Sequence, residues 1–363
     1  MRLRSAARAA LTALVLLTIG CGAVRTGGSP RPAAPAAPAA SVASVASASG
    51  VFGELPGDHP ALTRAGGSLY LRWDVPPAGA GMPVMALARV DPRTGAIAAR
   101  NTFSPGFVAA PVYADGSLWV TDSTSLGELL FRLAPRTLLM TGAVKLSGAR
   151  YAQGSHVAYA GGWLWADGGG QLLRVSPSTL TLTGVVPLRG AHWSNVGASQ
   201  DGSVLVVSEQ GKTGAVQRRN PRTGALIAAH PVAGGEAAVI DGFAGSGVWI
   251  TEILGMSAYA RLLSTATMTP RATAPIAAPA GLTLRVADGA VWVTGDEAGG
   301  PARNYCADAS TGRRLATLPV TSFTQGSLLA VGARVLYYAE PARHGSGTRI
   351  AQVPIPAECA TQQ

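Results

Sequence analysis

The residues that could do chemistry lie in polar stretches between apolar segments. Three of these stretches are richest: "ARYAQGSH" (149–156), "RGAHWSN" (189–195) and "GGEAAVID" (234–241). If they converge in the fold, they bring together an aromatic floor, imidazoles and an acid, which is what a small-molecule or sugar site uses. The alternative is that they are polar loop residues that contact water and one another. The candidate ligand-binding residues are Tyr151, His156, His192, Trp193, Asn195 and Glu236.

The sequence has no motif for several other kinds of chemistry. No pair of histidines has metal-ligand spacing, and no acidic loop of the EF-hand type is present. The chain also has no Gly-x-Ser-x-Gly elbow and no phosphate-binding glycine loop. We therefore expect no metal and no other cofactor. If the protein is an enzyme, its general base would be His156 or His192.

A second set of acids follows short apolar segments that resemble one another. "GSLWVTD" (116–122) is the type example, and each copy ends in a carboxylate. These acids could form a ring around a channel. A carboxylate at a strand end can instead accept hydrogen bonds from the N–H groups of the next turn, and this structural role explains the repetition better. The acids are Asp74, Asp122, Asp167, Glu209, Glu252, Asp296 and Glu340.

The elements that must position these residues recur at intervals of 40–49 residues. A turn with proline, such as "VDPRTG" (90–95) or "NPRTG" (220–224), follows most apolar segments after about 20 residues. A period of this length with several short strands per unit is typical of a β-propeller. We predict an all-β fold, a seven-bladed β-propeller with four-stranded antiparallel blades. The fifth unit lacks the turn pattern, which leaves its register open. The apolar segments are aligned on Leu69, Leu118, Leu164, Val204, Val248, Val291 and Val335.

The apolar segments also predict which strands are buried, and the two ends of the chain predict how the ring closes. The apolar segments barely alternate, as expected for strands buried on both faces, so Trp119, Trp165, Trp249 and Trp292 should pack between blades. The last unit has only three strands. We expect the ring to close when the N-terminal strand in "SGVFGELPG" (49–57) joins the last blade.

The N-terminal segment resembles a bacterial lipoprotein signal. Arginines begin it, an apolar run follows, and Cys21 ends it. The resemblance implies a signal peptide (1–20), a lipidated Cys21 that begins a tether rich in Pro, Ala and Ser (21–50), and a propeller (51–363). This places the protein outside the cytoplasm, anchored to the cell membrane by lipid. Ordinary secretory cleavage near Cys21 would instead release it.

The cysteine content and the net charge of the chain indicate its compartment and its possible partners. Cys306 and Cys359 remain after Cys21 is assigned, and in an oxidising compartment they should form a disulfide. The formal net charge is +10, but no block of basic residues is present. We therefore expect no nucleic-acid partner, and we expect a monomer.

The repeats "GSLWVTD", "GVWITE" (247–252) and "RVDPRTG" (89–95) resemble those of YVTN, NHL-like and virginiamycin B lyase-like propellers. The resemblance covers about residues 51–359. It implies the architecture but not the function, because propellers of these kinds include enzymes, sensors and scaffolds. No catalytic signature of the lyase matches. We favour a binding module of the bacterial cell envelope, with a protein, glycan or small molecule bound at the channel mouth. The alternative is a lyase- or hydrolase-type enzyme.

Overall fold

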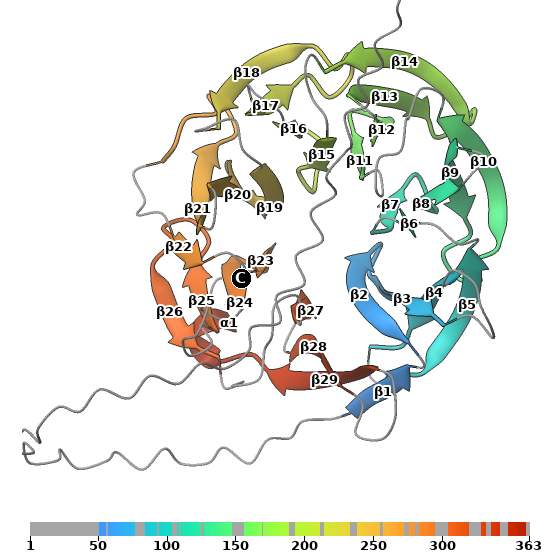
Figure 1. Ribbon diagram of the computed structural model, residues 1–363, viewed down its shortest axis with the longest axis vertical. Coiled ribbons are helices and arrows are strands. Elements are labelled where there is room, and N and C mark those ends of the chain that lie inside the picture. Colours follow the sequence, from blue (N-terminus) through green and yellow to red (C-terminus); the bar gives the residue numbers. More distant parts are fainter. Residues whose placement is uncertain are drawn as a thin grey trace, which may run out of the picture. The chain divides into compact units, whose positions relative to one another are not determined.

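The computed structural model describes residues 51–360 with gaps, the longest being 77–83, 147–155, 295–303 and 319–327. The described residues form antiparallel sheets, which we number in chain order (Figure 1). No helix among them is long and apolar enough to cross a bilayer.

Six of the sheets have four strands each. Sheet 1 contains β2 (Asp58–Ala65), β3 (Ser68–Val75), β4 (Val84–Val90) and β5 (Ile97–Phe103). Sheet 3 contains β11 (Val157–Ala160), β12 (Trp163–Gly168), β13 (Gln171–Ser176) and β14 (Thr181–Pro187). Sheet 4 contains β15 (Trp193–Ala198), β16 (Leu205–Gln210), β17 (Ala215–Arg219) and β18 (Leu226–Pro231).

The later sheets repeat this order. Sheet 5 contains β19 (Ala238–Ala244), β20 (Gly247–Leu254), β21 (Ser257–Ser264) and β22 (Ile276–Pro279). Sheet 6 contains β23 (Thr283–Ala287), β24 (Ala290–Thr294), β25 (Tyr305–Asp308) and β26 (Arg314–Thr317). Sheet 7 contains β27 (Leu328–Val331), β28 (Val335–Pro341), β29 (Thr348–Pro354) and, beyond β29, the N-terminal β1 (Val51–Leu55).

Sheet 2 differs, because it has five strands. Its first position is divided between β6 (Phe107–Val108) and β7 (Val112–Ala114), and both pair with β8 (Ser117–Thr124). Pro111 lies directly before β7, and a proline has no backbone N–H to donate to a ladder. β9 (Gly127–Leu133) and β10 (Met140–Leu146) complete the sheet. The prediction of a β-propeller with four-stranded antiparallel blades is confirmed, but the count of seven such blades is not met.

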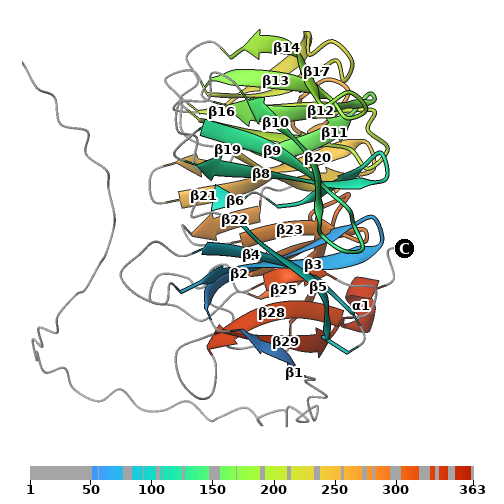
Figure 2. The same cartoon turned by 90° about the vertical axis from the view of Figure 1, so that its right-hand side faces the viewer.

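The first strands of neighbouring sheets contact one another around a common centre, and the fourth strands lie outermost (Figure 1). Figure 2 shows the same sheets from the side. This order places the first and second strands on the central part of the fold; His156 directly precedes the first strand β11, and Asn195 lies on the first strand β15.

Apolar packing lies between sheets. One buried cluster joins Tyr70 and Leu87 of sheet 1 to Leu118 of sheet 2. A corresponding cluster joins Trp73 of sheet 1 to Tyr337 of sheet 7, the first and last sheets along the chain. The predicted tryptophans between blades are confirmed: all are fully buried, in clusters shared by neighbouring sheets. They are Trp119, Trp165, Trp249 and Trp292.

Some of these aromatic side chains also donate a hydrogen bond to the next sheet. The indole N–H of Trp249 donates to the carbonyl oxygen of Ala309 at 2.7 Å, and that of Trp165 donates to Pro221 at 3.0 Å. Each acceptor lies in the turn between the third and fourth strands of the following sheet. The Tyr337 hydroxyl reaches the carbonyl oxygen of Pro92 in sheet 1 in the same way, at 3.4 Å.

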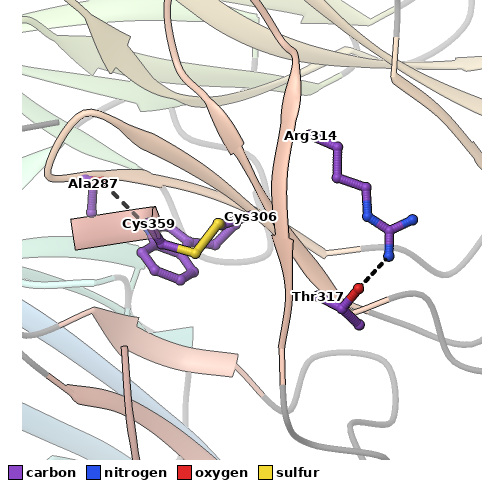
Figure 3. The surroundings of a disulfide bond; sticks show 6 residues. Ala287, Cys306, Arg314, Thr317 and Cys359 are labelled. Carbon is purple, nitrogen blue, oxygen red and sulfur yellow. Dashed lines mark hydrogen bonds between the residues drawn. A yellow bond between two sulfur atoms is a disulfide. The ribbon is translucent and has the colours of Figure 1, made fainter. Parts of the chain in front are cut away.

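A disulfide joins Cys306 of β25 to Cys359 of the short helix α1 (Ala357–Ala360) (Figure 3). Both cysteines are buried in a cluster with Trp292, whose indole N–H donates to the carbonyl oxygen of Ala287. The bridge spans 53 residues of sequence and fastens the C-terminal helix to sheet 6.

We expect Cys306→Ser to destabilise the fold. In the chain-entropy model, a loop of this length lowers the free energy of the folded state relative to the unfolded chain by about 4 kcal/mol. Urea unfolding of both proteins with and without reductant measures the loss. Reductant should destabilise the wild type and leave the variant unchanged. Equal stability of the two oxidised proteins would contradict the role of the bridge.

Trp249→Phe should cost more stability than Trp73→Phe. The Trp249 change leaves the buried carbonyl of Ala309 without its indole donor, which costs about 1–3 kcal/mol. Trp73 is as buried, but its indole N–H has no acceptor among the described residues. Chemical denaturation compares the free energies of unfolding. Equal losses would show that the bond between sheets contributes nothing.

Candidate functional site

The structure describes only part of the predicted ligand site. Tyr151, His192 and Glu236 lie outside the described residues, as do the lipidation candidate Cys21 and, for its side chain, Trp193. Trp193 and Asn195 belong to β15 and not to a loop, because the first strand of sheet 4 begins earlier than we expected. His156 directly precedes β11.

His156 lies beside the carboxylate of Asp167 at the end of β12. The His156 backbone N–H donates to Oδ1 of Asp167, and the Nδ1 atom of the imidazole lies 3.6 Å from Oδ2. The backbone N–H of Asp167 donates in turn to the carbonyl oxygen of His156 at 3.2 Å. The first and second strands of sheet 3 therefore hold the imidazole and the carboxylate together. The His156 side chain is 36% exposed.

Ser194 brings the next sheet into this cluster. Its hydroxyl donates to Oδ2 of Asp167 at 3.3 Å, so one carboxylate contacts residues of sheets 3 and 4. Asp167 is 2% exposed and Ser194 is 3% exposed. Asn195 is also buried, but it is the next residue of β15 and its side chain points to the opposite face of the sheet. We call His156, Asp167 and Ser194 the mouth cluster.

The electrostatics of the mouth cluster are dominated by the burial of Asp167. Burial raises the pKa of the Asp167 carboxyl above its ordinary value, although hydrogen bonds from His156 and Ser194 and the charge of His156 oppose the shift. In a Ser-His-Asp nucleophile the imidazole lies between hydroxyl and carboxylate. Here the carboxylate is in the middle. The carboxylate accepts hydrogen bonds from the His156 backbone and from Ser194 and lies 3.6 Å from a partly exposed imidazole.

Two other strand-end acids, Glu252 and Glu209, have side-chain partners. Glu252 accepts hydrogen bonds from His230 at 3.1 Å and from Arg261 at 3.0 Å, and Glu209 lies 3.8 Å from Arg219. Asp167 accepts a hydrogen bond from the backbone N–H of His156. The expectation that turn N–H groups satisfy these acids is therefore wrong for Glu252. Asp296 and the side chain of Glu340 lie outside the described residues.

The Glu252 group also spans two sheets. His230 belongs to β18, the outermost strand of sheet 4, whereas Glu252 and Arg261 belong to β20 and β21 of sheet 5. Burial would raise the pKa of the Glu252 carboxyl, but the hydrogen bonds and charges of His230 and Arg261 outweigh it and lower the pKa. The ion pair of Glu252 with Arg261 lies within sheet 5, and the hydrogen bond with His230 links it to sheet 4.

Sequence reasoning missed Asp167 as the partner of His156, and it missed Ser194 altogether. Asp167 appeared only as one member of the repeated strand-end acids. The signal that could have paired them is antiparallel pairing: the residue before a first strand lies beside the end of the second strand of the same unit. No group of three or more His, Cys, Asp or Glu residues in the described part of the chain could hold a metal ion.

Comparisons with known proteins add little to this description. No family model matches the chain, so the resemblance to YVTN, NHL-like and virginiamycin B lyase-like propellers finds no support there. No curated protein matches it significantly. One similar solved structure is the crystal structure of BamB from Moraxella catarrhalis, at 13% identity, with a TM-score of 0.48 and coverage of 75% of this chain and 82% of that one. We draw no functional conclusion from a likeness at this level.

Asp122→Asn should remove a loss of stability that the wild type shows as pH rises from about 4 to about 6. Asp122 is 2% exposed, and burial raises its pKa from 3.8 to about 6. Within this window the folded state keeps a proton that the unfolded chain loses, so folding becomes less favourable as pH rises. The full loss is about 3 kcal/mol, since one pKa unit corresponds to about 1.4 kcal/mol.

Urea unfolding between pH 3.5 and 8 measures this effect. The Asn variant should equal or exceed the wild type above pH 6 and have the flatter profile. Asp115→Asn is the control, because Asp115 is exposed. A variant at position 122 that keeps the wild-type pH profile would contradict the assignment.

Proposed function

We propose that this protein is an exported, lipid-anchored β-propeller that binds a protein or glycan of the bacterial cell envelope at its mouth. By the mouth we mean the end of the fold where first strands begin and second strands end. The proposed organisation is a signal peptide (1–20), a lipidated Cys21 with its tether (21–50), and the propeller (51–363).

We further propose that all the numbered sheets are blades of one closed seven-membered ring, with sheet 2 as a blade whose first strand is interrupted at Pro111. Two contacts support closure. Within sheet 7, the N-terminal strand β1 pairs with β29, and the Tyr337 hydroxyl of sheet 7 donates to the carbonyl oxygen of Pro92 in sheet 1. The second contact repeats the bond from Trp249 to Ala309 and the bond from Trp165 to Pro221. In a closed ring, the junction between the last and the first blade makes the same kind of contact as the junctions between consecutive blades.

The mouth cluster is the observation that carries the binding function. A buried carboxylate costs folding free energy unless hydrogen bonds or nearby charges compensate it, and perturbed carboxyl groups of this kind are common at functional sites. Asp167 lies at the junction of two sheets, 3.6 Å from a partly exposed imidazole. A propeller mouth with an oriented histidine and neighbouring aromatic residues can donate hydrogen bonds to carbonyl or hydroxyl groups of a partner. Trp193, Tyr151, His192 and Glu236 remain proposed members of the site.

The Cys306–Cys359 disulfide supports export, because structural disulfides persist in oxidising compartments. We propose that the protein is a monomer whose contact with the membrane runs through the lipid on Cys21.

A second candidate function rests on the same histidine. The 3.6 Å approach of Asp167 to the His156 imidazole suits a general base in a lyase- or hydrolase-type enzyme. Ser194 donates to Asp167 and is not placed as a nucleophile activated by His156. Turnover of an ester, lactone or glycoside that disappears in His156→Gln would favour this function.

Photo-crosslinking tests the binding function directly. A crosslinking amino acid at position 156 of the full-length protein should yield a discrete adduct with an envelope protein in living bacteria. The matched control places the same amino acid at Leu139, which is 66% exposed near the outermost strand of sheet 2. A glycan array with purified wild type and His156→Ala covers the case of a carbohydrate partner.

Membrane fractionation supplies the control for anchoring. Wild-type protein should sediment with membranes, and Cys21→Ser should not. Adducts of equal yield from positions 156 and 139 would contradict mouth binding. So would the absence of any adduct at position 156 together with glycan binding that survives His156→Ala.

A further inference from the structure

The exposed apolar side chains of this protein gather on one part of its outer surface. Among the described residues, every large apolar side chain that is exposed, except that of Tyr113, lies on or directly before the fourth strand of sheet 1, 2, 3 or 4. These strands, β5, β10, β14 and β18, follow one another around the outside of the fold (Figure 1). The exposed fractions of these side chains run from 48% to 66%. We call them the apolar band: Ile97, Leu139, Met140, Val185, Leu226 and Ile227.

Contacts between consecutive sheets make the band continuous. The side-chain amide of Asn101 on β5 donates at 2.9 Å to a carbonyl oxygen in the turn before β10. A Cβ at Gly142 of β10 would lie 2.5 Å from a methyl carbon of Leu180, in the turn before β14. A Cβ at Gly224, in the turn before β18, would lie 2.9 Å from a methyl carbon of Val186 on β14. Each fourth strand of the band therefore lies against the turn that leads into the next one.

The segments that carry the band are also basic. They contain five arginines or lysines and one acid, Asp91, whereas the whole chain has 29 Lys and Arg against 19 Asp and Glu. Arg136 and Arg222 are exposed in the turns before β10 and β18, beside the apolar side chains. The band thus combines apolar side chains with an excess of positive charge. The segments are 91–103, 134–146, 176–188 and 220–232.

The N-terminal strand enters the fold from the end where these fourth strands begin. β1 runs antiparallel to β29: Leu55 pairs with Thr348 at the start of β29, and Val51 pairs with Ala351 farther along. Third strands end, and fourth strands begin, at the end of the fold opposite the mouth. The residues before Val51 therefore join the fold from that end. A chain held in a membrane through Cys21 would present this end to the lipid.

We propose that the apolar band rests on the surface of an anionic lipid bilayer, with Arg136 and Arg222 among the lipid phosphate groups. Apolar side chains next to cations bind a protein to such a surface, because the apolar groups leave water at the boundary between headgroups and acyl chains and the cations attract anionic lipid. Guanidinium groups also match the geometry of phosphate. The proposal rests on the proposed export and anchoring of the chain. The mouth, at the other end of the fold, then stays open to a partner.

This contact is weak and reversible in a protein without the lipid, because it depends on a few side chains and on charge. Salt screens the attraction between exposed arginines and anionic headgroups. The contact should therefore be lost in high salt, which is the condition in which fractionation with bacterial membranes tests the anchor on Cys21.

Vesicle sedimentation of the full-length Cys21→Ser protein separates this surface from the lipid anchor. Vesicles of equimolar phosphatidylglycerol and phosphatidylcholine should bind the protein more tightly than vesicles of phosphatidylcholine alone. Arg136→Gln and Arg222→Gln, each added to this background, should weaken the binding about fivefold, as one arginine near an anionic surface contributes. Leu226→Ser combined with Ile227→Ser should weaken it about tenfold, because two apolar side chains no longer leave water.

Arg314→Gln and Tyr113→Ser, in the same background, are the matched controls. Arg314 is exposed at the start of the fourth strand of sheet 6, outside the band. Tyr113 is 42% exposed on β7, a first strand. Both variants should bind the anionic vesicles as the background protein does. All these proteins share residues 1–50, so a difference between them reports the folded part of the chain.

Three outcomes would overturn the proposal. One is binding of the Cys21→Ser protein that does not depend on phosphatidylglycerol. The second is unchanged binding in both Arg222→Gln and the Leu226→Ser, Ile227→Ser variant. The third is a dimer of the Cys21→Ser protein that the changes at 226 and 227 dissociate, because the band would then cover a second copy.

Failure of the anchor has a different readout. Wild-type protein that does not sediment with bacterial membranes in high salt would contradict the anchoring. Binding of the Cys21→Ser protein to anionic vesicles, with the losses expected for the band variants, would still support the lipid contact of the band.

Discussion

The contact between neighbouring sheets is the constraint on which the rest of this structure depends. The described sheets bury apolar residues in clusters that they share with neighbouring sheets. At several junctions an aromatic side chain of the second strand also donates a hydrogen bond to a turn of the next sheet, as Trp249 does to Ala309. The carbonyl groups of these turns are thereby satisfied, and the spacing of the sheets is fixed.

The positions of the charged side chains depend on these junctions between sheets. Asp167 of sheet 3 contacts Ser194 of sheet 4, and Glu252 of sheet 5 contacts His230 of sheet 4. None of these groups is complete within one sheet, so a shift between sheets would change both their distances and their pKa values. Packing between sheets is thus the link between fold and site.

The repeats made the blade predictable, because apolar segments and proline turns recur in phase along the chain. The pairing of Cys306 with Cys359 was inferred from cysteine content and is present in the structure. Local departures were not predictable in this way. The first position of sheet 2 is divided between β6 and β7, and β15 includes Trp193 and Asn195, which the sequence placed in a loop. Contacts between units, such as that of Ser194 with Asp167, depend on packing that periodicity does not specify.

Hydrogen exchange of the indole N–H groups tests this account most directly. Nitrogen-15 spectra of the oxidised wild-type protein in deuterated buffer report each tryptophan separately. If the bonds between sheets hold the fold together, the indole protons of Trp165 and Trp249 should exchange as slowly as the most protected backbone amides, because exchange of either kind of proton needs global opening. Exchange of either proton as fast as that of the partly exposed Trp163 would contradict the account.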